Sequence, residues 1–435
     1  MTMEKRSEFD HFIEKVTAHI KSKDAKRLVE QELTNHLEQS SLLLQKGGLS
    51  KEAADAQSIK YMGNPAVLGR DLHRLHKPRI DWGLIALFIV IISLGFLPLL
   101  AFDDVFRGAF IYRNAVLSLI TIAGAVLMQF IDYRILQRFR FSLYFIACVL
   151  IVANILFGTT IHGRLLGLEL GASGLRLGFL FPCLLLYLSW AGILRRLRKD
   201  ISFAKQTGLF LLCWAPFLLF IWSMQYMLAI SYLAAVIGMA AISGIDKRLL
   251  KRFFYTNLFT VALVALAFFL TAPQHVKDRI FVFIHPYGYD DNLGYFPRLI
   301  KKMLTEAGWF GQGLETNIHH ALPDFHTDLV FPFLVFTFGW LFGIFLVGIL
   351  VMFIWRIGNA AKKAADLYGK LLVGGGLLLF TVPIIYNVLM GTSLLPITSV
   401  SLPFISYGGD LSFFYAAITG IILSVYRRKD VVVPA

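Results

Sequence analysis

Charged side chains are scarce in this chain. Asp, Glu, Lys and Arg make up 16% of its 435 residues, whereas hydrophobic residues make up 57%. In soluble domains about a quarter of the residues are charged. This composition therefore excludes an ordinary soluble protein and indicates a membrane protein. Acidic residues are scarcer than basic ones, and the formal net charge is +14. In a membrane protein such an excess marks cytoplasmic loops near anionic lipids, so we expect membrane lipids and no nucleic acid as partners.

Cysteine is also rare. The three cysteines, Cys148, Cys183 and Cys213, lie far apart inside apolar runs. Their spacing excludes a metal site built on cysteine and a disulfide framework, so we interpret them as small buried hydrophobic residues. The first residues, MTMEKRSEFDHFIEKV, lack the apolar stretch of a cleavable signal peptide, and we expect none.

Residues 1–79 differ in composition from the rest of the chain, because they are polar and charged. Their apolar residues recur at helical spacing, on one stripe with Phe12, Val16 and Ile20 and a second with Val29, Leu33, Leu37 and Leu42. The stretch KGGLSKEAA predicts the end of one helix and the start of another, with Ser50 as the N-cap. We expect a small soluble helical domain whose thin core leans on the membrane surface or on a partner.

Residues 80–435 consist mainly of long apolar runs. Most of the runs meet the roughly 20 residues that a helix needs to cross a bilayer. The sequence therefore predicts an all-α polytopic membrane protein with about ten transmembrane helices. The runs lie near 82–101, 115–131, 141–158, 177–194, 207–223, 227–244, 254–272, 328–354, 370–392 and 405–426.

Basic residues gather in alternate loops, which predicts the orientation of the bundle. The positive-inside rule places these loops, both termini and residues 1–79 in the cytoplasm. The segment 273–327 then becomes a large external loop, and its glycines and aromatic residues argue against disorder. The basic loops lie at 134–140, 195–200, 246–252, 356–363 and 427–430.

The stretch ALPDFHTDLVFPF places Asp324, His326 and Asp328 at the start of the eighth apolar run. Asp328 could simply complement the dipole of that helix, a contribution of about 0.3–1 kcal/mol, with Thr327 as a cap. Alternatively, a carboxylate partly withdrawn from water at the hydrocarbon boundary can act as a general base. His326 could hydrogen-bond to Asp328 or to a substrate phosphate. Alternatively, it is an interfacial histidine whose polar atoms are hydrogen-bonded and that has no functional role.

Two glycine-containing stretches flank this motif in the sequence. GWFGQGLE includes Gly311 and Gly313, which permit close backbone approach and positive φ, and a short glycine loop can cradle phosphates. It lacks the Gly-Lys-Ser/Thr end of a P-loop. LLPITSVSLPFISYGGD includes Pro403 and the stretch SYGG, residues 406–409, and predicts either close helix packing or the wall of a pocket.

Basic residues also occur in the predicted external loop, against the topology bias. Arg279, Arg298, Lys301 and Lys302 suggest contact with an anionic ligand. The stretch 298–306 is amphipathic, however, so its lysines are equally explained as a solvated helix face.

Three stretches resemble, in this order, the motifs of the SEDS family (shape, elongation, division and sporulation), which comprises FtsW, RodA and SpoVE proteins. The family pattern GxGL is similar to GQGL at 311–314, and LPEAHTDFIF is similar to LPDFHTDLVF at 322–331. The pattern PLTGxPLPFISYGGSS is similar to LPITSVSLPFISYGGD at 395–410. The resemblance covers about residues 82–430. Residues 1–79 resemble the helical prefix domains of permease-type membrane proteins in Gram-positive bacteria.

The resemblance implies a function at the bacterial cytoplasmic membrane. Family members polymerise lipid II on its outer face in cell division, elongation or sporulation, beside a class B penicillin-binding protein. It implies that Asp328 is the general base that deprotonates the acceptor 4-hydroxyl, and that undecaprenyl diphosphate leaves. External basic residues or a divalent cation would stabilise the diphosphate; no protein metal site is implied. The implied substrate-binding residues are His326, Thr327, Asp324, Arg279, Gly311, Gly313, Pro403, Ser406, Tyr407, Gly408 and Gly409.

The chain departs from the family pattern at several interior polar positions. Residues 171–187 lack the Gln-Pro-Ser-Glu motif, and 222–229 lack Pro-Asp-Leu-Gly. Phe336 and Thr337 stand at the family's acidic pair, and Asp410 replaces a serine. A second hypothesis is therefore a non-catalytic member that binds lipid-linked precursor or acts as a scaffold. A third, a lipid or solute transporter, is disfavoured because no internal repeat is evident and the apolar runs are poor in charge. For residues 1–79 we expect a regulatory or docking role.

Overall fold

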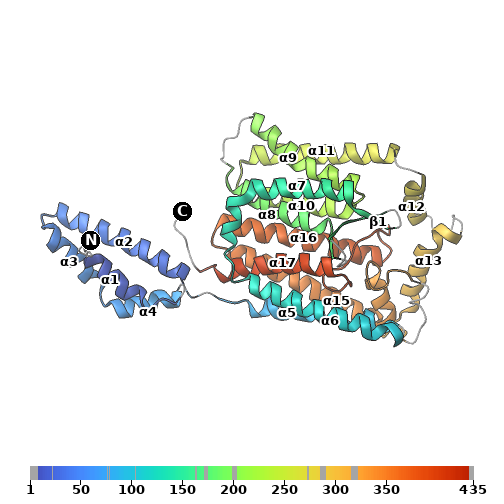
Figure 1. Cartoon of the computed structure of the whole chain (residues 1–435), viewed down its shortest axis with the longest axis horizontal. Coiled ribbons are helices and arrows are strands. Elements are labelled where there is room, and N and C mark those ends of the chain that lie inside the picture. Colours follow the sequence, from blue (N-terminus) through green and yellow to red (C-terminus); the bar gives the residue numbers. More distant parts are fainter. Residues whose placement is uncertain are drawn as a thin grey trace. The chain divides into compact units, whose positions relative to one another are not determined.

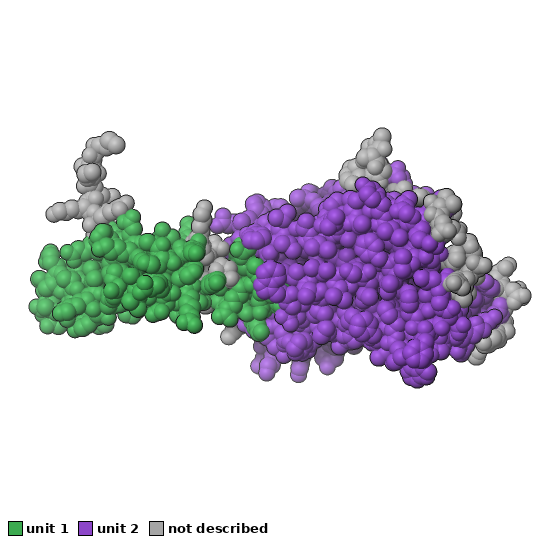
Figure 2. Space-filling view, turned by 90° about the horizontal axis from the view of Figure 1, so that it is seen from below, with its two compact units in different colours: residues 1–81, 363–366, 425–435 green, residues 82–362, 367–424 purple. Residues whose placement is uncertain are grey.

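The protein divides into two compact units (Figure 2). One contains residues 1–81, 363–366 and 425–435, and the other contains residues 82–362 and 367–424. The computed structural model describes residues 8–21, 23–75, 77, 79–102, 104–161, 164–170, 175–197, 203–271, 274–284, 291–314 and 322–430.

The first unit is a helical domain with a small apolar core. Its helices are α1 (Glu8–Thr17), α2 (Lys23–Lys46), α3 (Lys51–Met62) and α4 (Pro65–Leu75). The two predicted stripes of α1 and α2 meet in this core, except that Leu42 is 57% exposed. Ser50 caps α3 by accepting a hydrogen bond from the Ala53 amide at 3.4 Å, which confirms the predicted N-cap. The core contains Phe12, Ile13, Val16, Ile20, Ala25, Val29, Leu33 and Leu37.

The second unit is a bundle of apolar helices (Figure 1). Among the described residues, eight helical spans are long and apolar enough to cross a membrane, and two shorter helices are also apolar. Each predicted run overlaps one of these elements, so the chain is a multi-pass membrane protein. The elements are α5 (Trp82–Leu94) with η1 (Pro98–Ala101), α6 (Asp104–Met128), η2 (Tyr133–Phe139) with α7 (Arg140–Phe157), α8 (Leu180–Arg195), α9 (Phe203–Trp222), α10 (Tyr226–Ile242), α11 (Lys247–Thr271), α15 (Val330–Lys363), α16 (Leu367–Gly391) and α17 (Gly409–Arg427).

A small antiparallel sheet follows α7, which the all-α expectation omitted. Its strands are β1 (Thr159–Ile161), β2 (Arg164–Leu170) and β3 (Leu175–Leu177), in the order β1-β2-β3. The sheet is tied to the bundle by side-chain amides: Asn154 Oδ1 accepts from the Leu168 amide at 3.0 Å, and Gln225 Nε2 donates to the Leu165 carbonyl at 3.2 Å. Strands this short carry little periodicity, which explains why the sequence pattern did not reveal them.

The predicted external loop 273–327 contains two described helices, α12 (Gln274–Ile284) and α13 (Asp291–Glu306). They contact each other, and in Figure 1 they lie at the end of the bundle where β1 also lies. The amphipathic stretch predicted at 298–306 falls within α13. This end of the bundle therefore carries much more ordered chain than connecting turns require.

The packed centre of the bundle is built around α16. Three successive glycines of α16, residues 374–376, bring its backbone so close to α8, α10 and α17 that added Cβ atoms would meet their side chains at 2.3–3.0 Å. Polar side chains add specific links: Tyr187 Oη donates to the Leu372 carbonyl at 2.5 Å, and Trp190 Nε1 donates to Tyr232 Oη at 2.8 Å. Close packing of small residues is how helices associate where lipid replaces water.

Candidate active site

The segment before α15 forms a tight turn. Asp324 has a positive φ of 55°, and its carbonyl accepts hydrogen bonds from the amides of Thr327 and Leu329, both at 3.0 Å. The Asp324 side chain is exposed. Because α15 begins at Val330, Asp328 precedes the helix and does not lie in its first turn, where the dipole interpretation placed it.

Asp328 is held by three side chains from the C-terminal part of the chain. Ser399 Oγ donates to its Oδ2 at 2.5 Å, and Ser401 Oγ donates to its Oδ1 at 2.7 Å. Asn387 Nδ2, from α16, donates to the Asp328 carbonyl at 2.9 Å. Asp328 is half-buried and Ser399 is exposed, so the carboxylate is open to solvent on one side. Two hydroxyl donors fit a carboxylate, which can only accept, and fix the plane of the group.

The SYGG stretch holds the backbone on both sides of Asp328. Ser406 Oγ donates to the Thr327 carbonyl at 2.5 Å and accepts from the Leu402 amide at 2.7 Å. The Tyr407 amide donates to the His326 carbonyl at 2.8 Å. The bonds to Thr327 and His326 join residues about eighty positions apart in the sequence, and they bring the two sequence motifs together as one site.

The imidazole ring of His326 is surrounded by aromatic rings. Its ring centroid lies 5.0 Å from that of Phe325, 5.1 Å from Phe102 and 5.9 Å from Tyr407. Burial lowers the pKa of His326, and the charges of Asp324 and Asp328 oppose this shift. His326 Nδ1 and Tyr407 Oη are buried and have no hydrogen-bond partner in the described part of the chain. Unsatisfied buried polar atoms are costly, so these two atoms are natural contacts for a ligand or for water.

Gly311 lies in a loop that docks onto a break in α15. At the break, Gly339 has φ 88° and ψ 172°. The amides of Gln312 and Gly313 donate to the carbonyls of Phe336 and Thr337, and the Trp340 amide donates to the Gly308 carbonyl.

The two glycines at this contact have no room for side chains. A Cβ on Gly311 would meet the Thr337 carbonyl at 2.2 Å, and one on Gly339 would meet the Trp309 carbonyl at 2.2 Å. The close approach that the sequence suggested for a ligand is thus made by Gly311 to the backbone of α15. At Gly313, an added Cβ meets nothing within 4 Å, although its φ is 82°.

The other predicted site residues are distributed more widely. Pro403 is buried in the turn before α17, and Gly409 begins α17 beside Leu117 of α6; Gly408 lies between Tyr407 and that start. Arg279 lies in α12, and its side chain is outside the described set. The other basic residues of the predicted loop lie on α13: Arg298, Lys301 and Lys302.

Three residues of the site were missed by sequence reasoning: Ser399, Ser401 and Asn387. The first two had a usable signal, because residues two apart in an extended segment point to the same side. Asn387 gave no such signal, because a single asparagine in an apolar run does not show which loop its side chain forms hydrogen bonds with. Its Nδ2 also donates to the Val400 carbonyl, so it joins the two segments that position the carboxylate.

Arg107 of α6 was also missed, because the sequence pattern placed the start of this helix later. Its Nε donates to the Phe102 carbonyl at 2.9 Å. One turn further along α6, the Phe110 ring lies 6.3 Å from that of His326. Within the described residues, no group of three or more His, Cys, Asp or Glu side chains could hold a metal ion.

Comparison with known proteins agrees with this architecture. The family model of cell cycle proteins of the FtsW, RodA and SpoVE type matches residues 79–430. "Probable peptidoglycan glycosyltransferase FtsW" of Dichelobacter nodosus is 28% identical over 308 residues, which cover 68% of this chain and 74% of that protein. "Peptidoglycan glycosyltransferase MrdB" of Escherichia coli K12 is 25% identical over 312 residues, which cover 70% of this chain and 82% of that protein.

A solved structure shares the fold. A chain of a peptidoglycan synthase complex superposes with a TM-score of 0.67 at 24% identity, covering 80% of this chain and 98% of that chain. Because the family model spans well over half of its length, the chain belongs to the FtsW/RodA/SpoVE family of cell cycle proteins.

Proposed function

We propose that this protein is a peptidoglycan glycosyltransferase that polymerises lipid II at the outer face of a bacterial cytoplasmic membrane. The observation that carries the proposal is the Asp328 carboxylate, oriented by Ser399 and Ser401 and open to solvent on one side. The names of the relatives support the reaction type, since several are peptidoglycan glycosyltransferases.

In this mechanism Asp328 is the general base. Its carboxylate takes the proton from the 4-hydroxyl of the acceptor sugar, and that oxygen attacks the anomeric carbon of the donor. The new glycosidic bond forms as the bond to undecaprenyl diphosphate breaks, and the electron pair leaves with the diphosphate. Each carboxylate oxygen accepts one serine hydrogen bond and retains a second acceptor site for the substrate proton. A positioned base of this kind contributes roughly 10²–10⁴-fold to the rate.

The leaving diphosphate requires compensating positive charge. We assign this role to Arg107, on the face of α6 that also carries Phe110, and to the basic residues of α12 and α13, including Arg279 and Arg298. Fixed donors aimed at developing charge are the largest single contribution in many enzymes. A divalent cation would enter together with the diphosphate of the substrate. His326 Nδ1 and Tyr407 Oη, which have no hydrogen-bond partner among the described residues, are further polar contacts for the sugar-diphosphate.

The orientation follows from the charge of the loops. The positive-inside rule applied to the basic loops supports an arrangement with both termini and residues 1–79 on the cytoplasmic side, and with Asp328, α12 and α13 on the outer side. A class B penicillin-binding protein is the proposed partner on the outer side, supported by the similarity to a synthase complex that couples polymerisation and crosslinking. We assign residues 1–79 a docking or regulatory role. Co-purification of partners from cells that express the full or shortened chain tests both assignments.

Replacement of Asp328 by Asn tests the proposal. Asn retains the shape of the side chain and removes its basicity, so lipid II polymerisation by the purified protein is expected to fall by about 10²–10⁴-fold. Asp246→Asn is the matched control, because Asp246 is an exposed acid in the connection between α10 and α11, outside the site, and its turnover should stay within about threefold. Unchanged turnover of the Asp328 variant would refute the assignment of the base.

A scaffold without catalysis is the second candidate. The specific observation in its favour is that Phe336 and Thr337 are buried at 5% and 2% exposure in the α15 break, where the family pattern has acids. In that case the wild-type protein would bind lipid II without polymerising it, and cellular function would be insensitive to Asp328→Ala.

A further inference from the structure

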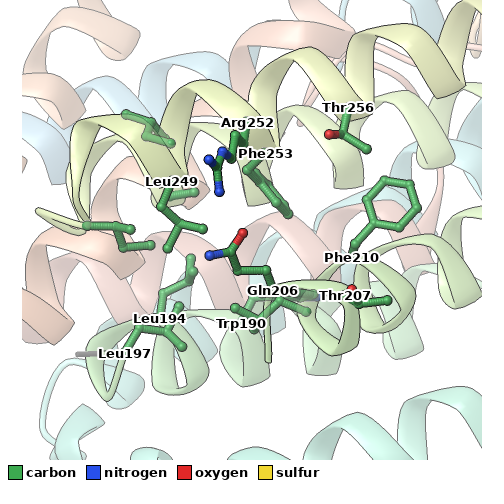
Figure 3. Close-up of a pocket in the computed structure, with 14 residues that line it drawn as sticks. Trp190, Leu194, Leu197, Gln206, Thr207, Phe210, Leu249, Arg252, Phe253 and Thr256 are labelled. Carbon is green, nitrogen blue, oxygen red and sulfur yellow. The ribbon is translucent and has the colours of Figure 1, made fainter. Parts of the chain in front are cut away.

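A cavity of about 320 Å³ lies among the ends of four helices (Figure 3). Its walls come from the end of α8, the start of α9, the end of α10 and the start of α11. The lining residues are Trp190, Leu194, Leu197, Gln206, Thr207, Leu209, Phe210, Ala240, Ile245, Leu249, Leu250, Arg252, Phe253 and Thr256.

The path of α8 separates the cavity from the proposed active site. Gly178, just before α8, lies beside the carboxylate of Asp410, which is in the first turn of α17 and close to Tyr407. From there α8 runs for 16 residues to Arg195, a rise of about 24 Å. The cavity lies at the far end of this helix, so it belongs to the opposite end of the bundle.

The cavity combines apolar walls with a cationic group, the guanidinium of Arg252, at its rim. Trp190 and Leu194 are buried, and Phe210 and Phe253 close the sides. Arg252 from α11 and Gln206 from α9 point toward one another across the opening (Figure 3). A small anion would not use the apolar walls, and a neutral apolar molecule would not use the guanidinium. The lining therefore matches a ligand with an anionic head and a hydrocarbon tail.

The surroundings carry more positive charge. The first two turns of α11 contain Lys247, Arg248, Lys251 and Arg252, and α8 ends at Arg195. Both α9 and α11 provide candidate membrane spans that begin at this cavity, so their basic starts lie where lipid head groups lie. Basic residues at this depth attract anionic lipids, and one that contacts the phosphate directly strengthens binding by roughly fivefold.

Loose packing of α11 leaves space for such a ligand. Only 6% of the apolar stretch of α11 that could span a membrane is buried. Among the described helices, α11 packs mainly against α10. The cavity volume is at the low end of small-molecule sites, about 300–1,000 Å³. It accommodates part of one acyl chain, while a phosphate stays outside at Arg252.

We propose that this cavity binds an anionic phospholipid. The phosphate contacts Arg252 and the Gln206 amide, and an acyl chain packs against Trp190, Phe210 and Phe253. The lipid fills the space between α9 and α11 and fastens α11 to the bundle from the basic side. This site is independent of the proposed glycosyl transfer, because no residue is shared between them.

Thermal unfolding of the purified full-length chain in detergent, titrated with dioleoylphosphatidylglycerol, tests the proposal without any activity measurement. Dioleoylphosphatidylcholine is the head-group control. The charge variant is Arg252→Gln, and its matched control is Arg248→Gln, which removes the same charge from the same helix outside the cavity. Thr256→Trp, on α11, and Thr207→Trp, on α9, fill the cavity without changing its charge.

Phosphatidylglycerol is expected to raise the unfolding midpoint saturably, and phosphatidylcholine much less. Arg252→Gln should need about fivefold more phosphatidylglycerol than wild type, and Arg248→Gln the same amount as wild type. A filled variant whose midpoint without lipid equals that of wild type should lose the saturable rise. Equal responses to both lipids would overturn the proposal, as would equal weakening by the two arginine variants. A wild-type response in both filled variants would also overturn it.

Discussion

The helices of the membrane unit form two sets that differ in packing far more than in hydropathy. In α15, α16 and α17, 50%, 61% and 61% of the membrane-span window is buried, whereas the values for α6 and α11 are 11% and 6%. The mean hydropathy of these windows overlaps completely, because α11 and α16 both have 2.0. Apolar composition therefore tells which segments enter the membrane, and close contacts decide which of them form the packed core.

The proposed chemistry belongs to the packed set. Asp328 stands directly before α15, Asn387 comes from α16, and Ser399 and Ser401 lie in the connection from α16 to α17. A catalytic group must be held within a fraction of an ångström, which rigid neighbours provide and a lipid-exposed helix does not. The loosely packed α11 instead borders the proposed lipid cavity, where movement is less costly.

The same substitution in each set should have opposite effects on stability. Gly339→Ala places a Cβ about 2.2 Å from the Trp309 carbonyl at a φ of 88°, so it should destabilise the protein by about 2 kcal/mol or more. Gly124→Ala in α6 meets nothing within 4 Å and should stabilise it by about 0.5–1 kcal/mol. Thermal unfolding in detergent measures both.

Gly348→Ala is the control within α15, because it also meets nothing within 4 Å. If Gly339→Ala unfolded at the wild-type temperature, the docking of the 308–313 loop onto α15 would not have the role described. If Gly124→Ala were as damaging as Gly339→Ala, the division into packed and loose helices would fail.

Lowering the pH should decrease the stability of the protein by a smaller amount, and this effect arises at His326, which lies beside the packed helices. Burial holds the pKa of His326 below its usual value of 6.5, so the unfolded chain binds this proton more readily than the folded chain does. The free energy of unfolding should therefore rise with pH across the interval between the two pKa values, and fall as pH drops from 7 towards 5. His326→Gln should show a shallower decline in unfolding midpoint over that range. An identical decline in both proteins would contradict the burial of the imidazole.

The sequence predicted the membrane segments well, because long apolar runs report directly on burial in hydrocarbon. The boundary between the predicted runs 207–223 and 227–244 is confirmed, because α9 ends at Trp222 and α10 begins at Tyr226. The start of α6 was placed too late. Arg107 and Arg113 interrupt the apolar pattern there, although the helix continues through them to Met128.

The site was foreseen only in part. The grouping of HTD with SYGG follows from the family resemblance, whereas the serine donors and Asn387 depend on how the turn before α17 folds back. The sequence did not predict the break in α15 either, because a single glycine at 339 inside an apolar run does not indicate that its φ is positive. Hydrogen bonds between residues some seventy positions apart leave no local pattern in a single sequence.

The central claim is that the carboxylate of Asp328, oriented by two serines, carries the reaction. Its most direct test is the rate of lipid II polymerisation for the Ser399→Ala, Ser401→Ala double variant, measured with Asp328 intact and again with Asp328→Asn. With Asp328 intact, the serine changes should lower kcat by about 10- to 100-fold and leave KM within about twofold. In the Asn protein the same changes should leave the residual rate unaltered, since the group they orient is gone. An equal loss in both proteins would contradict the account.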